Sequence, residues 1–342
     1  MDRYLLVVFL CFTKFTFSSS QGWSYLPNAN VGPANWAGIC STGKKQSPID
    51  IKSTEITHDK GLGAFTLENY DRKLNKTFTG SNTGYAFGMA FPERVYNVSG
   101  GGLNGVYTTV QFHFHYGPND TVGSEHIVDG EHYAAELHFV SYNTKYDNLV
   151  QAIEHEDGLA VLGLFIQVGG INNTAFSFLE NARNLSESYS SMGGIPAFRF
   201  DSLLPANKTK YFRYSGSLTT PSCKESVTWT VFRDAVNISQ YQMNLLRQLQ
   251  KTYTTLSVGN YRPVQPLYNR IVRASFQPSA DTNSATSAPR ISTGSIATSA
   301  TEQASPAATV GCGLGSSAVR MSAGLYLLML FAASSAIFIH EF

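Results

Sequence analysis

The stretch VQFHFHYGPND, residues 110–120, alternates aromatic residues with two histidines. Such alternation is typical of a β-strand, in which residues i and i+2 project from the same face. His113 and His115 therefore share one face, and Phe112 and Phe114 point into a core on the other. Neutral imidazole nitrogen is a common zinc ligand, and a rigid strand fixes both rings. The stretch predicts two of the ligands of a metal site.

A third candidate ligand is His138, in the strand-like segment AAELHFV. The intervening stretch GPNDTVGSEHIVDGEHY contains turn residues, which lets the second strand return antiparallel beside the first. Catalytic zinc takes three protein ligands and keeps one position open. Taken alone, the paired histidines leave two alternatives open, because surface histidines and histidines stacked in a core give the same pattern.

Two polar companions favour the metal site. Gln111 shares the strand face of His113, and Glu136 shares the face of His138. Metal-bound imidazoles usually donate their other N–H to such amide or carboxylate groups. These two hydrogen-bonding residues therefore favour a zinc site over a chance arrangement of histidines.

Residues 23–276 contain no linker, repeat or low-complexity break. Short apolar or alternating segments recur between Gly, Pro and Asn residues, as the strands of a sheet require. They are GAFTLENY, YAFGMAF, TTVQFHFHYG, YAAELHFVSYN, LAVLGLFIQVGG, KYFRYSGSLT and ESVTWTVF. The run AVLGLFIQV is apolar on both faces and predicts a central strand that is covered on both sides.

Helices are expected to be few. The clearest is SQYQMNLLRQLQ, with Ser239 as its N-cap and Met243, Leu246 and Leu249 on one face. AFSFLENARNL is a second candidate. The patterns together predict one mainly β domain, of the α+β type, with about 250 residues.

Composition limits the class of ligand. The chain has 342 residues and a net charge of +1, and no run of Lys or Arg is longer than a pair. This distribution offers no electrostatic footprint for nucleic acid or for another polyanion. A small, uncharged or weakly charged ligand fits better.

The N-terminal residues 1–20 have a short polar head, an apolar run at residues 5–12 and small residues at 18–20. This pattern is typical of a secretory signal peptide and is too short for a membrane span. The alternative is an N-terminal core strand. We expect the mature chain to begin near Gln21, and the folded domain to cover residues 21–276.

The C-terminal region divides into two parts. Residues 277–316 are rich in Ser, Thr, Ala and Pro and nearly lack large apolar residues, which is typical of an extended stalk, and we expect the anchor attachment region at its end. Residues 317–342 contain a mostly apolar tail; the only nearby Lys or Arg, Arg320, precedes the apolar run, and none lies on its other side. A membrane span normally has such cations on its cytoplasmic flank. The tail therefore favours a glycosylphosphatidylinositol (GPI) signal, which is removed and replaced by lipid, over a membrane span.

Cysteines and sequons agree with export. Cys11 lies in the predicted signal peptide and Cys312 beside the anchor signal, which leaves Cys40 and Cys223 in the folded region. An even pair suits an oxidising compartment. Seven N-x-[ST] sequons suit a glycosylated domain. They begin at Asn75, Asn97, Asn119, Asn172, Asn184, Asn207 and Asn237.

Eight motifs follow one another along the folded region: QSPIDI, QFHFHYG, GSEH, YAAELHFV, DGLAVLG, GSLTTPSC, VTWTVF and NYRPVQPLYNR. In this order and at these spacings the chain resembles the α-class carbonic anhydrases, and in particular an extracellular, GPI-anchored member. The resemblance covers residues 23–276. It implies a large, twisted, mostly antiparallel central sheet with short peripheral helices. It also implies the reversible hydration of CO₂ to bicarbonate and a proton.

The resemblance also assigns the metal site. The zinc ligands would be His113, His115 and His138. Three further positions match groups that accept hydrogen bonds from these ligands: Gln111, Glu136 and the backbone carbonyl of Asn260.

The resemblance gives Thr219 and Glu125 a joint role. Thr219 matches a threonine whose hydroxyl accepts a hydrogen bond from zinc-bound hydroxide and donates one to a carboxylate, here Glu125 of GSEH. Zinc lowers the pKa of its bound water to about 7, so hydroxide is available at neutral pH. Because the Thr219 proton is committed to Glu125, the hydroxide must donate to Thr219 and aim a lone pair at CO₂.

An apolar wall beside the zinc would hold CO₂. The matching residues are Val140, Val161, Leu218, Val227 and Trp229, with Thr220 next to Thr219. For any one of them alone, ordinary sheet core is the alternative. Cys40 and Cys223 match the disulfide of the extracellular members, which fixes the loop that carries Thr219. His126 matches a buried structural histidine.

One position departs from the family pattern. The segment NTGYAF has Tyr85 where the family has a proton-shuttle histidine. Histidine has a pKa near the operating pH, whereas tyrosine has a pKa near 10. Nothing in the sequence places His58, His132 or His155 at the mouth of the cavity, and Tyr25 matches a tyrosine that orders water there. We therefore expect an enzyme limited by proton transfer and partly rescued by small buffers.

Two other functions are considered. A non-catalytic carbonic-anhydrase-like binding or adhesion domain would have lost zinc ligands, but all three histidines are present, as are Thr219 and Glu125. A cupin-like metal oxygenase also uses an H-x-H strand, but it needs a Glu shortly after the second His. The expected partners are CO₂ and bicarbonate, and a membrane reached through the lipid anchor.

Overall fold

Two long neighbouring strands carry the three candidate zinc ligands. The computed structural model describes residues 22–181, 185, 190–248 and 258–277. In it, β7 (Tyr107–Tyr116) and β9 (Ala135–Asn143) pair antiparallel, with His113 opposite His138. Phe112 and Phe114 are fully buried on the other face of β7. The predicted alternation and the antiparallel return are confirmed.

The apolar run AVLGLFIQV forms the middle of β10 (Leu159–Gly169), whose first eight residues are all buried. β10 pairs antiparallel with β9 on one side and parallel with β13 (Val227–Phe232) on the other. Its even-numbered side chains, such as Leu162, belong to one core cluster, and Leu159 and Val161 belong to another. The strand is therefore central and covered on both faces, as the sequence predicts.

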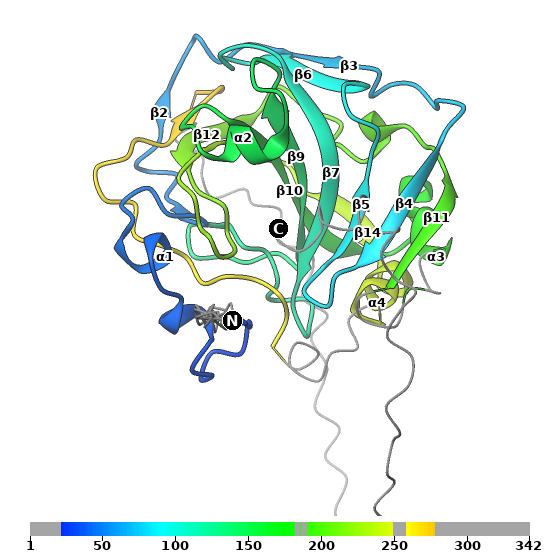
Figure 1. The fold of residues 1–342 in the computed structure, drawn as a ribbon, viewed down its shortest axis with the longest axis horizontal. Coiled ribbons are helices and arrows are strands. Elements are labelled where there is room, and N and C mark those ends of the chain that lie inside the picture. Colours follow the sequence, from blue (N-terminus) through cyan, green and yellow to red (C-terminus); the bar gives the residue numbers. More distant parts are fainter. Residues whose placement is uncertain (1–21, 182–184, 186–189, 249–257, 278–342) are drawn as a thin grey trace, which may run out of the picture. The chain divides into compact units, whose positions relative to one another are not determined.

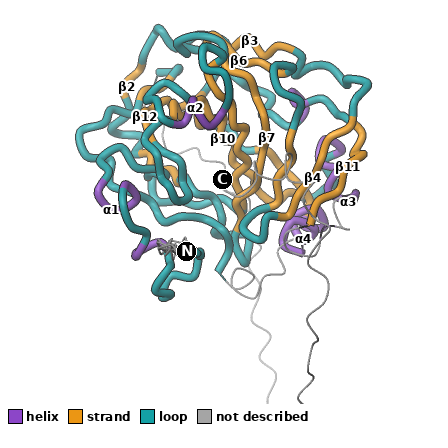
Figure 2. The backbone as a smooth tube through the Cα atoms, in the orientation of Figure 1, coloured by secondary structure: helices purple, strands orange, loops and turns teal. Residues whose placement is uncertain are grey.

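The described strands build one 13-stranded mixed sheet, and β1 and β8 form a separate pair (Figures 1 and 2). The main order is β11-β4-β5-β7-β9-β10-β13-β12-β15-β2. Most neighbours are antiparallel, as predicted, and the parallel exceptions in this sheet are β10–β13, β10–β14 and β15–β2. The remaining strands are β1 (Asp50–Ile51), β2 (Thr57–His58), β3 (Phe65–Glu68), β4 (Thr77–Asn82), β5 (Phe87–Ala90), β6 (Tyr96–Gly100), β8 (Ile127–Val128), β11 (Ser190–Pro196), β12 (Tyr211–Gly216), β14 (Val236–Ser239) and β15 (Arg273–Ala274).

The described helices are short and peripheral (Figure 2). They are α1 (Ile39–Thr42), α2 (Leu149–Ile153), α3 (Phe178–Asn181) and α4 (Gln240–Gln248), with 3₁₀ turns η1 (Pro33–Asn35), η2 (Thr174–Phe176) and η4 (Phe200–Ser202).

The predicted helix with Ser239 as its cap is α4. The Ser239 hydroxyl accepts the backbone N–H of Gln242 at 3.1 Å, and Met243 and Leu246 are fully buried. Leu249 lies outside the described residues. The second predicted helix is broken in its described part into η2 and α3, because the 3₁₀ turn ends before Phe178.

The sheet separates two hydrophobic cores. One face carries an aromatic cluster that includes Phe112, Phe139 and Phe200. The other face carries a cluster with Val140, Val161 and Trp229. Because side chains alternate along a strand, His138 lies on the same face of β9 as Val140. The candidate metal centre therefore sits against the second cluster.

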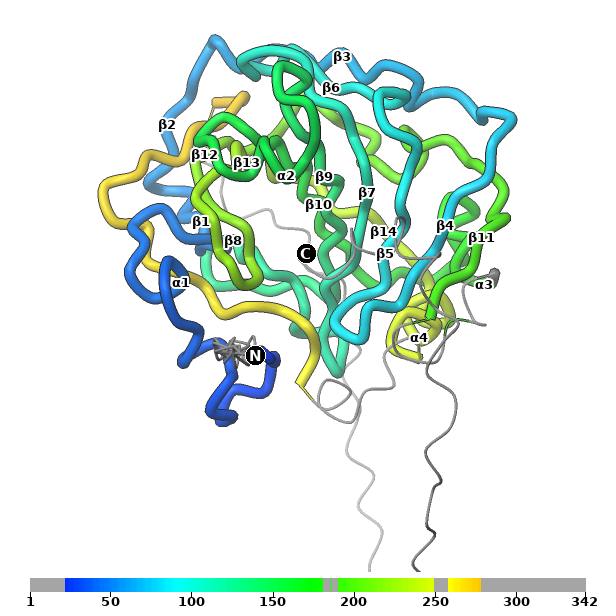
Figure 3. The backbone as a smooth tube through the Cα atoms, viewed as in Figure 1, coloured from blue at the N-terminus to red at the C-terminus, as the bar shows by residue number. Residues whose placement is uncertain are grey.

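Segments far apart in the sequence meet beside α1. Figure 3 shows the segment at residues 258–277 running past α1 and β1. The contact is a hydrogen bond from the Arg262 side chain to the carbonyl of Cys40 at 2.9 Å. None of the helices in the described parts of residues 22–277 has the length and hydropathy of a membrane span. The predicted signal peptide, anchor signal and nearly all of the stalk (residues 278–342 and 1–20) lie outside the described residues.

Candidate metal centre

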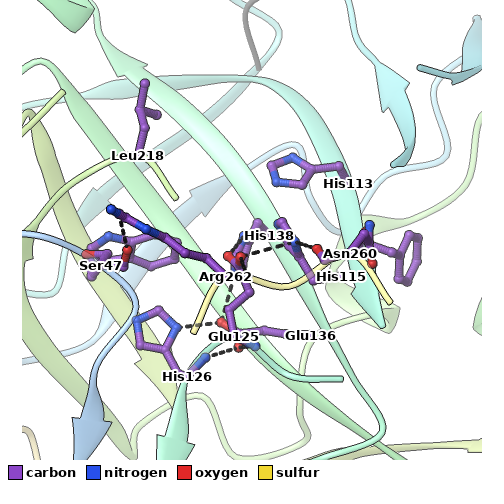
Figure 4. A network of polar contacts seen from close by, with 12 residues as sticks. Ser47, His113, His115, Glu125, His126, Glu136, His138, Leu218, Asn260 and Arg262 are labelled. Carbon is purple, nitrogen blue, oxygen red and sulfur yellow. Dashed lines mark hydrogen bonds and ion pairs between the residues drawn. The ribbon is translucent and has the colours of Figure 1, made fainter. Parts of the chain in front are cut away.

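Three imidazoles converge on one face of β7 and β9 (Figure 4). His113, His115 and His138 each offer a ring nitrogen, and these nitrogens all lie within 4.8 Å of one another. The ring centroids are 4.9 Å apart for His113 and His115, and 4.7 Å apart for His115 and His138. The structure thus brings together the three residues that the sequence singles out as metal ligands.

Hydrogen bonds fix the orientation of the two rings on β7. His113 Nδ1 donates to the side-chain oxygen of Gln111 at 2.9 Å. His115 Nδ1 donates to the backbone carbonyl of Asn260 at 2.7 Å. Because both acceptors are carbonyl oxygens, each Nδ1 carries the proton. The lone pair of each ring is therefore on Nε2, where a metal would bind.

Glu136 organises the third ring. Its Oε1 accepts hydrogen bonds from Nε2 of His138 and from Nδ1 of His126, both at 2.7 Å. Its Oε2 accepts hydrogen bonds from the backbone N–H groups of Glu125 and His126. Burial alone would raise the pKa of Glu136, but the two imidazoles lower it below the usual range. The carboxylate is therefore charged, and Nδ1 of His138 is left for a metal. The other nitrogen of His126 lies 2.6 Å from the Tyr214 hydroxyl, so His126 offers no free ligand atom.

Burial keeps the three imidazoles neutral. It lowers the pKa of His113 well below its ordinary value, and the neighbouring imidazoles lower it further. The pKa of His115 falls to about 3, again mainly through burial and then through His138. The pKa of His138 is also lowered, although Glu136 opposes the effect of burial. Neutral imidazole is the form that coordinates a metal.

One imidazole nitrogen of the centre is buried without a partner. Nε2 of His115 is enclosed and makes no hydrogen bond within the described residues. Leaving such a group unpaired typically costs about 1–3 kcal/mol. A zinc ion held by three neutral imidazole nitrogens satisfies this atom, and the donor set is one that catalytic zinc sites use. The residues present therefore fit zinc.

Glu125 lies beneath the centre. Its Oε1 accepts a hydrogen bond from the backbone N–H of Arg262 at 2.9 Å and lies 3.4 Å from Nδ1 of His115. Its Oε2 is buried and has no hydrogen-bond partner among the described residues. Burial raises the pKa of Glu125 well above its ordinary value, whereas the Arg262 N–H and the nearby Thr219 hydroxyl lower it. Thr219 and Thr220 are both buried. The Thr219 hydroxyl therefore lies near the Glu125 carboxylate, but its geometry is not that of a regular hydrogen bond.

Two residues that the sequence analysis did not single out hold this region in place. The Arg262 guanidinium donates to the side-chain oxygen of Gln46 (2.9 Å) and to the carbonyls of Ser47 (2.8 Å) and Cys40 (2.9 Å). The Gln46 amide in turn donates to the carbonyl of Cys223 at 3.1 Å. The motifs QSPIDI and NYRPVQPLYNR contain these residues, so the signal was present but its meaning required the fold.

A disulfide closes the same corner of the molecule. Cys40 and Cys223 are bonded, with their Cα atoms 5.0 Å apart although they are separated by 183 positions in sequence. Cys223 follows Thr219 in the loop between β12 and β13. Together, the disulfide and the Gln46–Arg262 pair tie this loop to both ends of the described chain.

The apolar residues predicted beside the site lie in one cluster. Val140, Val161 and Trp229 are direct neighbours across β9, β10 and β13, because Val161 is in register with both. Val227 and Leu218 belong to the same cluster. The Trp229 ring centroid is 4.8 Å from that of His138, so this wall reaches the metal centre.

Tyr85 lies near the centre through its backbone. Its carbonyl accepts the side-chain N–H of Asn260 at 3.0 Å, and the Asn260 carbonyl orients His115. The Tyr85 ring stacks on Trp23, with centroids 4.0 Å apart. Tyr25 is buried in the same aromatic cluster, and burial holds its pKa well above the ordinary value.

Comparisons with known proteins agree with this arrangement. The sequence model of the eukaryotic-type carbonic anhydrase family matches residues 31–276. "Putative carbonic anhydrase 5" of Caenorhabditis elegans is 38% identical over 281 residues, which cover 80% of this chain and 88% of that protein. "Carbonic anhydrase 3" of Homo sapiens is 36% identical over 269 residues, which cover 75% of this chain and all of that protein, and the protein of the same name from Rattus norvegicus is 35% identical over 266 residues. With a family match over residues 31–276 and relatives above one third identity, the chain belongs to the eukaryotic-type carbonic anhydrase family, a family of enzymes that hydrate CO₂.

Proposed function

We propose that this protein is a zinc-dependent carbonic anhydrase, with His113, His115 and His138 as the zinc ligands. The observation that carries the proposal is the unpaired, buried Nε2 of His115 beside two more neutral imidazoles whose other nitrogens are already hydrogen-bonded. Gln111, Glu136 and Asn260 would hold the three rings in their ligating orientation. A bound zinc ion supplies a Lewis acid that lowers the pKa of a coordinated water to about 7.

Thr219 and Glu125 are proposed to orient the attacking oxygen. Glu125 is held by the Arg262 N–H, and its Oε2 remains available to accept the Thr219 proton. When the Thr219 hydroxyl donates to Glu125, its own oxygen can only accept a hydrogen bond from the nucleophile. This arrangement directs a lone pair of the nucleophile toward the substrate.

The apolar cluster beside His138 is proposed as the CO₂ site. CO₂ carries no charge and no hydrogen-bond donor, so valine and tryptophan side chains suit it. The residues assigned to this site are Val140, Val161, Leu218, Thr220, Val227 and Trp229. The contact of Trp229 with His138 supports the assignment, because the four other apolar residues belong to the same cluster as Trp229.

Proton release is proposed to be slow. Tyr85 occupies the position from which a histidine would relay the proton to solvent, and a phenol with a pKa near 10 exchanges protons poorly at pH 7. No histidine other than the three ligands and His126 contacts these rings within the described residues. A small buffer such as imidazole should therefore accelerate turnover.

The outer cell surface is the proposed location. The disulfide supports passage through an oxidising compartment. Residues 1–20 would be the signal peptide, residues 277–316 the stalk, and residues 317–342 the signal for a lipid anchor. Six of the seven sequon asparagines are described and none is buried, which suits glycosylation; Asn184 lies outside the described residues.

The experiment is stopped-flow CO₂ hydration on the purified full-length protein, with zinc measured on the same sample. We expect about one zinc per chain and a rate that rises with imidazole concentration. Zinc without activity would contradict the proposed substrate site. Protein that folds but binds no zinc would identify a non-catalytic binding domain instead.

A further inference from the structure

Arg213 lies on the sheet face opposite the candidate metal centre. It is in β12 between Phe212 and Tyr214, which belong to the core cluster beside the metal centre. Because side chains alternate along a strand, Arg213 projects from the other face. There it packs beside Tyr211 of the aromatic cluster, with the guanidinium carbon 5.6 Å from the ring centroid.

The Arg213 side chain is buried with few hydrogen-bond partners. Only 6% of the residue is exposed. Its Nε and Nη2 both donate to one oxygen, Oγ1 of Thr230, at 3.2 and 2.9 Å. A guanidinium has five N–H bonds, so the remaining ones, including both on Nη1, have no hydrogen-bond acceptor within the described residues. No carboxylate lies within 4.0 Å of it there, although a buried charge is normally paired.

Nη1 faces a glycine turn at residues 100–102. These three glycines have φ values of +71°, +54° and +72°, and a Cβ added to Gly102 would lie 3.6 Å from Nη1 of Arg213. Nη1 is not fully enclosed, in contrast with the unpaired Nε of Arg262. The Tyr211 hydroxyl lies 2.8 Å from the carbonyl of Gly63 and 3.2 Å from that of Gly101, so the Gly101 carbonyl points toward Tyr211. In a trans peptide unit the C=O and the N–H point in opposite directions. The Gly102 N–H, which shares a peptide unit with the Gly101 carbonyl, therefore points away from Tyr211.

A second arginine stands directly opposite Arg213. Arg273 of β15 is its register partner across the antiparallel pair, so the two side chains share one face. Like charges in such positions repel, and Arg273 adds to the effect of burial in lowering the pKa of Arg213. One carboxylate is nearby: Asp59, whose Oδ2 lies 3.4 Å from Arg273 Nη1. Asp59 is therefore paired with Arg273, and Arg213 has no carboxylate partner of its own among the described residues.

We propose that Arg213, Arg273 and the turn at residues 100–102 bind a small oxyanion of the carboxylate or bicarbonate type. Guanidinium groups pair with two oxygens of such an anion at once, and a backbone N–H of a glycine turn can donate to it. The N–H groups of Gly101 and Leu103 already donate to the carbonyls of Ala64 and Gly100, so the turn would contribute the N–H of Gly102. The anion supplies acceptors for Nη1 and relieves the repulsion between the arginines. The site shares no residue with the metal centre, so it stands independently of the proposed zinc chemistry.

The test is calorimetric titration of the full-length protein with acetate, bicarbonate or chloride at constant ionic strength. The protein is first treated with a chelator, which removes any anion binding that depends on zinc. We expect one saturable site for acetate and bicarbonate, with at least about tenfold weaker binding in Arg213→Met, the loss of one charge-assisted contact. Arg199→Met is the matched control, because Arg199 is an exposed arginine already paired with Asp201. Equal acetate affinities of the wild type and Arg213→Met would overturn the proposal. An affinity for chloride equal to that for acetate would overturn it too.

Two further variants keep the test informative if Arg213→Met is unstable. Arg273→Gln changes a side chain that is 56% exposed, and it should weaken acetate binding several-fold. Gly102→Ala places a methyl group 2.8 Å from Leu62 Cδ2 and close to Nη1, and should also weaken binding. CO₂ hydration by Arg273→Gln should equal that of the wild type. A folded Arg273→Gln protein with unchanged acetate affinity would show that water alone solvates Arg213.

Discussion

The indole of Trp23 stacks on the phenol of Tyr85, with ring centroids 4.0 Å apart and planes inclined by 16°. The Tyr85 backbone is held independently, because its carbonyl accepts a hydrogen bond from Asn260. Asn260 also orients the candidate ligand His115. The stacking on Trp23 therefore positions the ring at position 85, and the hydrogen bond from Asn260 positions its backbone.

Tyr85→His should increase turnover. Imidazole has a pKa near 7 and exchanges protons at neutral pH, and its flat ring can keep the stacking on Trp23. We expect CO₂ hydration at pH 7 in weakly buffering medium to rise by about tenfold or more. The measurement is the maximal rate at low and at high imidazole concentration.

The control for this prediction is Tyr268→His, which makes the same change at an exposed tyrosine. It should leave the rate and its dependence on imidazole unchanged. If Tyr85→His equalled the wild type at low buffer, proton transfer would not limit this enzyme, and the role assigned to position 85 would be wrong.

His115→Ala should abolish zinc binding. Among the residues that the structure describes, His115 offers the one buried ring nitrogen without a partner, and removing it leaves two ligands, one fewer than catalytic zinc sites use. We expect zinc content to fall from about one per chain to a small fraction, and activity to fall with it. His155→Ala provides the control, because His155 is exposed and stacks on Tyr146 instead. Full zinc occupancy in His115→Ala would remove this residue from the ligand set.

Thr219→Val should lower the maximal rate without loss of zinc. Valine matches threonine in shape but has no hydroxyl, so Glu125 loses its proposed donor and the nucleophile loses its acceptor. We expect a decrease of about 10²-fold, typical for one hydrogen-bonding group that acts in the transition state. Thr220→Val, the neighbouring change, should cost clearly less. Equal effects of the two substitutions would mean that Thr219 has no special position.

The sequence predicts the framework of the site well because that framework is local. Alternation in β7 and β9 fixes which residues face the metal centre, and a run of apolar residues marks β10. Strands β4, β6 and β11 were not predicted. Their sequences, such as TFTGSN and SSMGGIP, are rich in polar residues and glycine, and only pairing with neighbouring strands makes them extended.

Contacts between distant segments could not be predicted from the pattern. Arg262 reaches Gln46 over 216 positions in sequence, and the two motifs that contain them carry no sign of that partnership. The pairing of Arg213 with Arg273 likewise depends on the register of β12 and β15. Composition and periodicity describe one segment at a time, whereas these contacts depend on how the sheet assembles.

Removal of the metal should make the stability of the protein strongly pH-dependent. In the metal-free protein, burial lowers the pKa of all three ligand histidines, and that of His115 falls to about 3. An unfolded histidine has a pKa of about 6.5, so the unfolded state binds more protons below that pH. The stability from the neutral buried rings is present above pH 6.5 and is lost as pH falls toward 3. Urea unfolding of chelator-treated protein between pH 7.5 and about 4.5 should therefore show a falling midpoint. A midpoint independent of pH would contradict neutral burial of these rings.

Replacing both Cys40 and Cys223 by Ser should reduce stability far more than it reduces zinc binding. The disulfide spans 183 positions, and closing so long a loop contributes about 5 kcal/mol in the chain-entropy description. In the folded state, however, the carbonyls of both residues are also held, by Arg262 and by Gln46. The loop that carries Thr219 therefore keeps its anchors once the chain is folded. We expect a large fall in the urea midpoint of the doubly substituted protein, with zinc content near that of the wild type below the unfolding transition. Loss of zinc from protein that remains folded would show that the disulfide itself, and not these hydrogen bonds, holds the site in place.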